Sequence, residues 1–415
     1  MEENKEQGNG SNFEKPKNHF GHKNKIFNIM SNMKPNIILE RCCGIHRFQF
    51  IDGVLSLPNR KMKAFGILIV TVYSAIFFCF FFLIATMSAT CRIMALTDAI
   101  SSFVVHFQHC AAIITANFVT GSMNICLINL LEEVDNILQV ERCPDLYEVM
   151  GSRLNLYLKI MIISQIINAV VDLFSCLDVI LSIIVLPLYF IQKLEVFSFC
   201  SYVIMVNWRL GIINSYMKEF TQKHAKKIGT VFTIRDVKIN TEKMFNFIGN
   251  PSGKNIKIRD LATAYDSIGE ICCITNYVFN FQIFLTLISG FTDIVITLWL
   301  SLSFYRTSVY NTTELINVVI WCLNAINNII TISYTCELLL VTRNETRVLV
   351  NKIIMNFELP QTMRAQAKAF MELLEAWPLR IYVYDMFSID TKLILKFISV
   401  VTTYLIVMIQ ISHFI

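Results

Sequence analysis

Long stretches without charged residues constrain this chain more than any other feature of its sequence. Crossing the hydrocarbon core of a membrane takes about 20 helical residues, and charged side chains are rare in such segments. With 54% hydrophobic and 16% charged residues, the chain is too apolar for a soluble domain and is predicted to be an all-α membrane protein. Five spans are clear: Ala64 to Cys91, Ala99 to Leu131, Ile271 to Tyr305 (with Asp293 inside), Leu315 to Cys336, and Phe397 to Ile415.

A further apolar block, Leu154 to Trp208, is too long for one span. We predict two spans in it, about Asn155 to Cys176 and about Leu181 to Asn207, with a turn near Asp178. An outer loop that reaches Glu195 is an alternative, and both versions give seven transmembrane helices. The charged residues that interrupt the block are Lys159, Asp172, Asp178, Lys193 and Glu195.

The distribution of Lys and Arg predicts the orientation, because positive residues are retained in the cytoplasm. With the N-terminus cytoplasmic and the C-terminus extracellular, the outer loops hold only Arg92 and Arg306, and nearly all of the 36 Lys and Arg residues are cytoplasmic. This orientation divides the chain into four parts: a cytoplasmic N-terminal segment (1–63), six spans with the ligand pocket and cytoplasmic helical extensions (64–340), a cytoplasmic linker (341–392) and a seventh span (393–415).

Asn311, in the sequence Asn-Thr-Thr, falls in the last outer loop and is the expected glycosylation site. The 13 cysteines are scattered without a CxxC pair, and most lie in predicted spans, so we expect no metal site and no disulfide framework. Cys91 and Cys176 approach the outer face, where a bridge is conceivable but free thiols are favoured. No catalytic motif stands out, so we expect no enzyme, no cofactor and no nucleic-acid partner.

The C-terminal span carries the most specific motif. It contains Thr403-Tyr404, five apolar residues and Gln410, and it follows the sequence Phe387-Ser388-Ile389-Asp390. This pattern resembles the TYhhhhhQF signature of the insect gustatory receptors, with Ile411 in place of the final Phe. The segment Arg209 to Asn214 is similar to the RFxxLN element of that family. The chain length and the inverted seven-span plan agree with the same family.

The resemblance implies a tetrameric, nonselective cation channel that a tastant opens, in the plasma membrane of sensory neurons. The seventh spans of four subunits would surround the pore, in a homotetramer or a heterotetramer with other gustatory receptors. Ser399, Thr403, Ile406 and Gln410 share one face of the predicted helix, which is compatible with a pore lining. The alternative is that Thr403 and Gln410 form hydrogen bonds between helices. The expected pore residues are Ser399, Thr403, Ile406, Gln410 and Ile411.

Polar residues inside the first six spans are candidates for a ligand pocket, because burying them in lipid is costly. They lie at comparable depths in several spans and beside aromatic residues, which is typical of a site for small molecules. For each residue, an internal hydrogen-bond network that never meets the ligand is an equally good interpretation. The candidates are His106, His109, Asn168, Asp172, Asp293, Trp321 and Asn324.

The sequence does not name the ligand. Bitter or plant secondary compounds are the first expectation, a sugar such as fructose is the second, and a related odorant-receptor channel is a further alternative. A secondary transporter is disfavoured because no internal repeat is evident. A metabotropic seven-span receptor is disfavoured because it has the opposite orientation. Membrane lipids and cations are the other expected partners.

Overall fold

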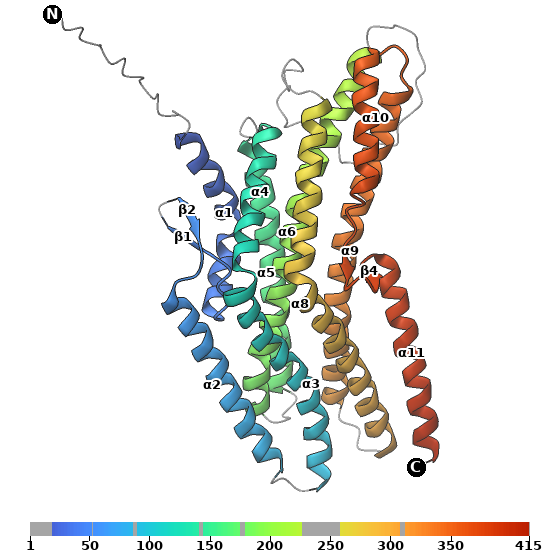
Figure 1. The fold of residues 1–415 in the computed structure, drawn as a ribbon. Helices are drawn as coiled ribbons and strands as arrows, with labels where there is room; N and C mark the ends of the chain where they lie inside the picture. Colours follow the sequence, from blue (N-terminus) through green and yellow to red (C-terminus); the bar gives the residue numbers. More distant parts are fainter. Residues whose placement is uncertain are drawn as a thin grey trace, which may run out of the picture.

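The computed structural model describes residues 19–51, 53–85, 89–140, 144–174, 179–225, 258–307 and 312–414, and these residues form a helical bundle (Figure 1). Two short antiparallel hairpins pair β1 with β2 and β3 with β4. The helices are α1 (His19–Cys42), α2 (Arg60–Ala85), α3 (Ala89–Ile114), the π-helical turn η1 (Thr115–Val119), α4 (Gly121–Ile137), α5 (Pro144–Phe174), α6 (Val179–Ala225), α8 (Ile258–Thr307), α9 (Thr312–Met355), α10 (Gln361–Ala376) and α11 (Thr391–Phe414); the strands are β1 (Gln49–Ile51), β2 (Val54–Ser56), β3 (Tyr382–Val383) and β4 (Phe387–Ser388).

The long helices run alternately up and down, with α10 at the upper end and the last turn of α11 at the lower end of Figure 1. Among the described residues, six segments are long and apolar enough to cross a membrane. The predicted seventh span is α11, whose 24 residues reach about 36 Å at 1.5 Å per residue. The six segments are Arg60–Phe82, Ser102–Val119, Leu146–Val171, Ile184–Phe220, Ile258–Trp299 and Val319–Met355.

The helix boundaries refine the predicted spans. α5 ends at Phe174 and α6 begins at Val179, so two helices divide this block as predicted, while Asp178 itself lies outside the described residues. α6 continues through Lys193 and Glu195, so the alternative of an outer loop that reaches Glu195 is wrong. The first span was placed too long, because α2 ends at Ala85 and Cys91 belongs to α3.

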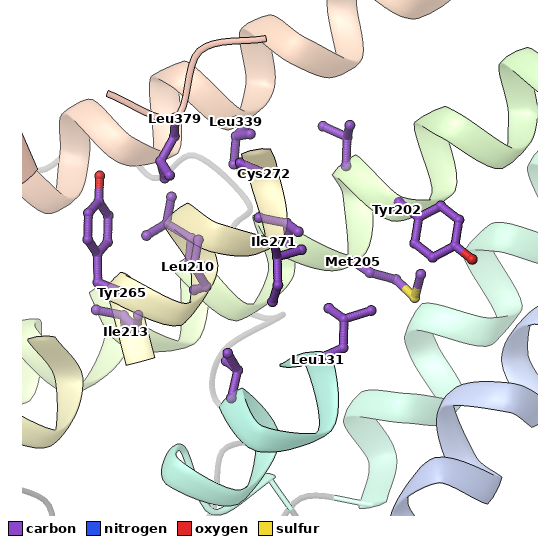
Figure 2. Close-up of a cluster of buried hydrophobic side chains, with 14 of the residues drawn as sticks. Leu131, Tyr202, Met205, Leu210, Ile213, Tyr265, Ile271, Cys272, Leu339 and Leu379 are labelled. Atoms are coloured by element: carbon purple, nitrogen blue, oxygen red, sulfur yellow. The ribbon is translucent and has the colours of Figure 1, made fainter. Parts of the chain in front are cut away.

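Three helices are much longer than a membrane is thick. α6, α8 and α9 contain 47, 50 and 44 residues, which at 1.5 Å per residue gives roughly 70, 75 and 66 Å, against about 30 Å of hydrocarbon. Their upper ends pack together with α4 and α10 around an apolar core. Figure 2 shows this core, to which α4, α6, α8, α9 and the segment after α10 contribute Leu131, Met205, Ile271, Leu339 and Leu379.

Trp377 closes this core at the end of α10. Its indole Nε1 donates a hydrogen bond to Asp266 (2.7 Å), and its carbonyl accepts one from the hydroxyl of Tyr265 (2.7 Å). The ring lies on Gly269, where an added Cβ would come within 2.5 Å of it. Position 269 therefore has no room for a side chain while Trp377 stays in place.

A buried ion cluster ties the segment after α1 to α6. The Arg47 guanidinium binds Glu40 (Nε to Oε1, 3.0 Å) and Glu195 (Nη2 to Oε2, 2.8 Å), and all three side chains are buried. The guanidinium also lies over the ring of Phe279 at 4.6 Å from its centroid. Burial alone would lower the pKa of Arg47, but the carboxylates of Glu195 and Glu40 raise it above its usual value. The group stays charged, and its ion pairs offset its desolvation.

Candidate ligand site

A partly open cavity lies between α5, α6, α8 and α9. The space in it that is open to the centre of a water-sized sphere is about 10 Å³, roughly enough for one water molecule. Most of its lining side chains carry an amide or an ionisable group, which is unusual for the membrane part of a helical bundle. The lining residues are Gln165, Asn168, Tyr189, Gln192, Lys193, Gly290, Asp293, Trp321, Asn324, Ala325 and Asn328.

Asp293, on α8, is held by hydroxyl groups. The hydroxyl of Tyr189 donates to Asp293 Oδ1 at 3.0 Å, and Ser289, one turn earlier on α8, donates to Oδ2 at 3.5 Å. The same Ser289 accepts a hydrogen bond from Gln192 Nε2 (2.9 Å), which also donates to Gln108 on α3 (3.0 Å). The carboxylate therefore ends a chain of hydrogen bonds that connects the cavity with the centre of the bundle.

Lys193, on α6, reaches the same cavity from another wall. Its side chain is 6% exposed. Its ammonium group donates to Asn324 Oδ1 on α9 at 2.8 Å and to Ser164 Oγ on α5 at 3.5 Å. The three helices are thus joined at one polar point inside the bundle.

An aromatic pair forms the less polar part of the wall. The rings of Tyr189 and Trp321 meet edge to face, with centroids 4.6 Å apart and planes at 60°. Val105 and Leu188 pack behind them. The cavity therefore combines hydrogen-bonding groups with a flat apolar surface, which is the usual composition of sites for small molecules.

The structure brings together four of the seven predicted ligand residues: Asn168, Asp293, Trp321 and Asn324 all line the cavity. The side chain of a fifth, Asp172, lies outside the described residues, although its backbone belongs to α5. Sequence reasoning missed Lys193 as a pocket residue, since its charge inside an apolar block suggested a span boundary instead. Tyr189 and Gln192 gave no signal of their own.

The two predicted histidines do not line the cavity. His106 stacks on Phe77 of α2, with ring centroids 5.0 Å apart, and its Nε2 lies 3.2 Å from Ser74 Oγ. His109 meets the ring of Tyr73 edge to face at 5.5 Å. Both histidines therefore contact α2, and their role in ligand binding stays a prediction.

α11 stands at the side of the bundle (Figure 1). Its first turn is held by Asp390, whose Oδ1 accepts a hydrogen bond from the backbone N–H of Lys392 (3.0 Å), and by Glu337 of α9, which accepts one from the N–H of Thr391 (3.2 Å). Further along, Phe291 of α8 meets Tyr404 and Phe397 edge to face at 5.3 and 6.3 Å.

The predicted pore residues of α11 lie largely on its open side. Ser399, Thr403, Ile406 and Gln410 are exposed in the single chain. The side chain of Ile411 and all of Asn311 lie outside the described residues. Within the described part of the chain, no group of three or more His, Cys, Asp or Glu residues could hold a metal ion.

Comparison with known proteins adds four findings. A family model described as 7tm Chemosensory receptor matches residues 34–413. Among solved structures, the chain is similar to the insect olfactory receptor OR5 from Machilis hrabei, with a TM-score of 0.63 and 12% sequence identity over 93% of this chain and 100% of that chain. The structure of that receptor in complex with eugenol gives the same values. No curated protein matches the sequence.

Proposed function

Because the chain belongs to the 7tm chemosensory receptor family, we propose that it is a gustatory receptor that works as a ligand-gated, nonselective cation channel. The family consists of receptors and not of enzymes. The fold is that of an insect olfactory receptor. The gustatory assignment rests on the TY and Gln pattern of residues 403–410, which is a feature of this sequence.

One observation carries the channel proposal: α8 lies between the cavity and α11. Gly290 and Asp293 of α8 line the cavity, while Phe291 of the same helix turn packs on Phe397 and Tyr404 of α11. A ligand that moves this turn of α8 therefore also moves α11. The ligand shifts the channel toward the open state only by the difference between its affinities for the two states.

The pore is proposed to form from four copies of α11. A single α11 cannot enclose a pore, and its polar residues Ser399, Thr403 and Gln410 are exposed beside apolar ones. Four such helix faces around one axis would line a water-filled pore with an apolar constriction at Ile406 and Ile411. Amide and hydroxyl groups without net charge would discriminate weakly among cations.

Bitter or other plant secondary compounds are the proposed ligands. The edge-to-face pair of Tyr189 and Trp321 suits the flat rings that many such compounds contain. A sugar is the second candidate, and the amides of Gln165, Asn168 and Asn324 favour it, because hydroxyl-rich ligands need many hydrogen-bonding partners.

Patch-clamp recording tests the function. The full chain is expressed in cultured cells and challenged with separate panels of plant compounds, sugars and volatile odorants. A cation current that follows a plant compound and reverses near 0 mV is expected, as in any poorly selective channel. A surface-expressed protein that gives no current with any panel contradicts the channel proposal. Responses confined to odorants would instead support the odorant-receptor alternative.

A further inference from the structure

The cavity between α5, α6, α8 and α9 contains a buried cation, Lys193, that has no acidic partner among the side chains that the structure describes. Lys193 is 6% exposed, and its hydrogen bonds go to the neutral oxygens of Asn324 and Ser164. It makes no ion pair with any carboxylate whose side chain the structure describes. A charge buried without a counter-ion is costly, so residues of this kind inside a membrane are candidates for ligand binding.

The amide of Asn324 supplies a second donor beside this ammonium group. Lys can only donate hydrogen bonds, so the contact at 2.8 Å fixes the oxygen of Asn324 toward Lys193 and leaves the amide nitrogen on the other side. That nitrogen, Nδ2, is buried and has no hydrogen-bond partner within the described part of the chain. Two donors from neighbouring helices, the charged ammonium group of Lys193 and the amide nitrogen of Asn324, are therefore available to an acceptor in the cavity.

Gln165, another residue that lines the cavity, has an acceptor atom without a donor among the described residues. Gln165 of α5 donates from Nε2 to the carbonyl of Leu186 at 3.1 Å, while its buried Oε1 accepts no hydrogen bond from any described residue. The rings of Tyr189 and Trp321 provide the apolar surface of the cavity. A complementary molecule has an acidic group, a hydroxyl or other donor, and a flat apolar body.

We propose that the cavity binds a small organic carboxylate of this kind, such as a phenolic acid, with its carboxylate on Lys193 and Asn324. The inference rests on the proposed function, because it takes the cavity to be the receptor's ligand site. It goes further by naming the chemical class. Within the plant compounds proposed above it selects the acidic ones, and it disfavours sugars, which would leave the Lys193 charge without a counter-ion.

Binding to the purified full chain in lipid nanodiscs tests the class without relying on channel activity. Isothermal titration calorimetry compares 4-hydroxybenzoate with 4-hydroxybenzamide, and 4-hydroxycinnamate with its amide. Each pair has the same shape and differs in charge. We expect each acid to bind at least about ten-fold more tightly than its amide, a difference of about 1.4 kcal/mol. Sodium chloride at the same concentration is the control for a general effect of anions.

Three variants locate the effect. Lys193→Met should lose the preference for the acid, whereas Lys159→Met, at an exposed Lys of α5 outside the cavity, should keep it. Asn324→Asp is the more specific test, because it replaces the amide nitrogen, which has no partner among the described residues, by a carboxylate oxygen next to Lys193. It should abolish binding of the acid and raise the melting temperature of the ligand-free protein, because Lys193 gains a counter-ion.

The outcomes separate this inference from the proposed function. Equal binding of acid and amide, absence of acid binding, or unchanged acid binding in Asn324→Asp each overturns the carboxylate site, even if other compounds open the channel. Tight, Lys193-dependent acid binding without any ligand-evoked current would keep the site and contradict the channel proposal instead.

Discussion

Arg47 and Lys193 are both buried cations, but only Arg47 has acidic partners among the described residues. The planar guanidinium of Arg47 binds carboxylates from two helices and lies over an aromatic ring. This geometry suits arginine, whose donors are arranged in a rigid fork. Lys193 makes hydrogen bonds to neutral groups and reaches the cavity. The contacts of Arg47 therefore stabilise the fold, while Lys193 lines the cavity that is proposed to bind the ligand.

Replacing Arg47 tests its structural role. Arg47→Met leaves Glu40 and Glu195 buried without their cation, and breaking a buried ion pair in this way costs about 3–5 kcal/mol. We expect a lower melting temperature of the purified protein and less protein at the cell surface. Lys218→Met is the matched control, because the Lys218–Glu345 pair is exposed and such pairs contribute little. Equal stability of the two variants would contradict the structural role of Arg47.

Ile411 is the residue that tests the proposed gate. If four Ile411 side chains form an apolar ring that resists wetting, Ile411→Ser should raise the cation current that flows without ligand. Gln410→Ala should instead change conductance or ion preference. Whole-cell recording without ligand measures both. An Ile411→Ser channel that reaches the surface, conducts with ligand and is as silent as the wild type without it would overturn the gate assignment.

At the scale of helices, the sequence predicted the spans and their helical extensions, but not how the extensions pack. Runs such as Ala64 to Cys91 are recognised locally, because the membrane excludes charge from every span. The burial of the upper ends of α6, α8 and α9 could not be predicted, because it depends on α10 and on residues near 379–393, far away in the sequence. Two functional elements show the same contrast: the pattern of α11 was visible, whereas the pairing of Tyr189 with Trp321 required the folded structure.

The contact between α8 and α11 predicts how ligand binding reaches the pore. Phe291→Ala removes both edge-to-face ring contacts of Phe291 with α11, and each such pair contributes about 0.5–1.5 kcal/mol beyond its buried area. We expect a smaller maximal ligand-evoked current, while the ligand dissociation constant changes less than about two-fold. Tyr277→Ala, at an exposed position of the same helix, should leave the current unchanged. Unaltered currents in Phe291→Ala would show that α8 does not transmit the signal through this contact.

At the scale of the whole molecule, a large apolar surface of α11 has no packing partner within the described part of the chain. Leu395 and Ile398 are 70% and 53% exposed, and within the described chain α11 packs chiefly on α8 and α9. In a lipid bilayer such a helix can face lipid, but its hydroxyl and amide groups at Thr403 and Gln410 are better satisfied by other copies of the helix.

Assembly is therefore expected to be part of the fold in the membrane. Native mass spectrometry of the purified protein in mild detergent should show a tetramer. If only monomers appear, also after cross-linking in the membrane before extraction, the pore of four α11 helices is excluded.

The upper core has a consequence for how the protein is made. Ile29 and Met33, from the first described helix, share this core with Leu374 and Ile389, which follow hundreds of residues later. Because the ribosome synthesises the chain from its N-terminus, the first six spans are made before α10 and the β3–β4 hairpin, and this core stays incomplete until those segments emerge. A chain that ends before this point exposes apolar surface to the chaperones and proteases of the cell. The contact of Trp377 with Gly269 can form only after α10 has been made, so it belongs to a late step of folding, with the β3–β4 hairpin and α11 still to follow.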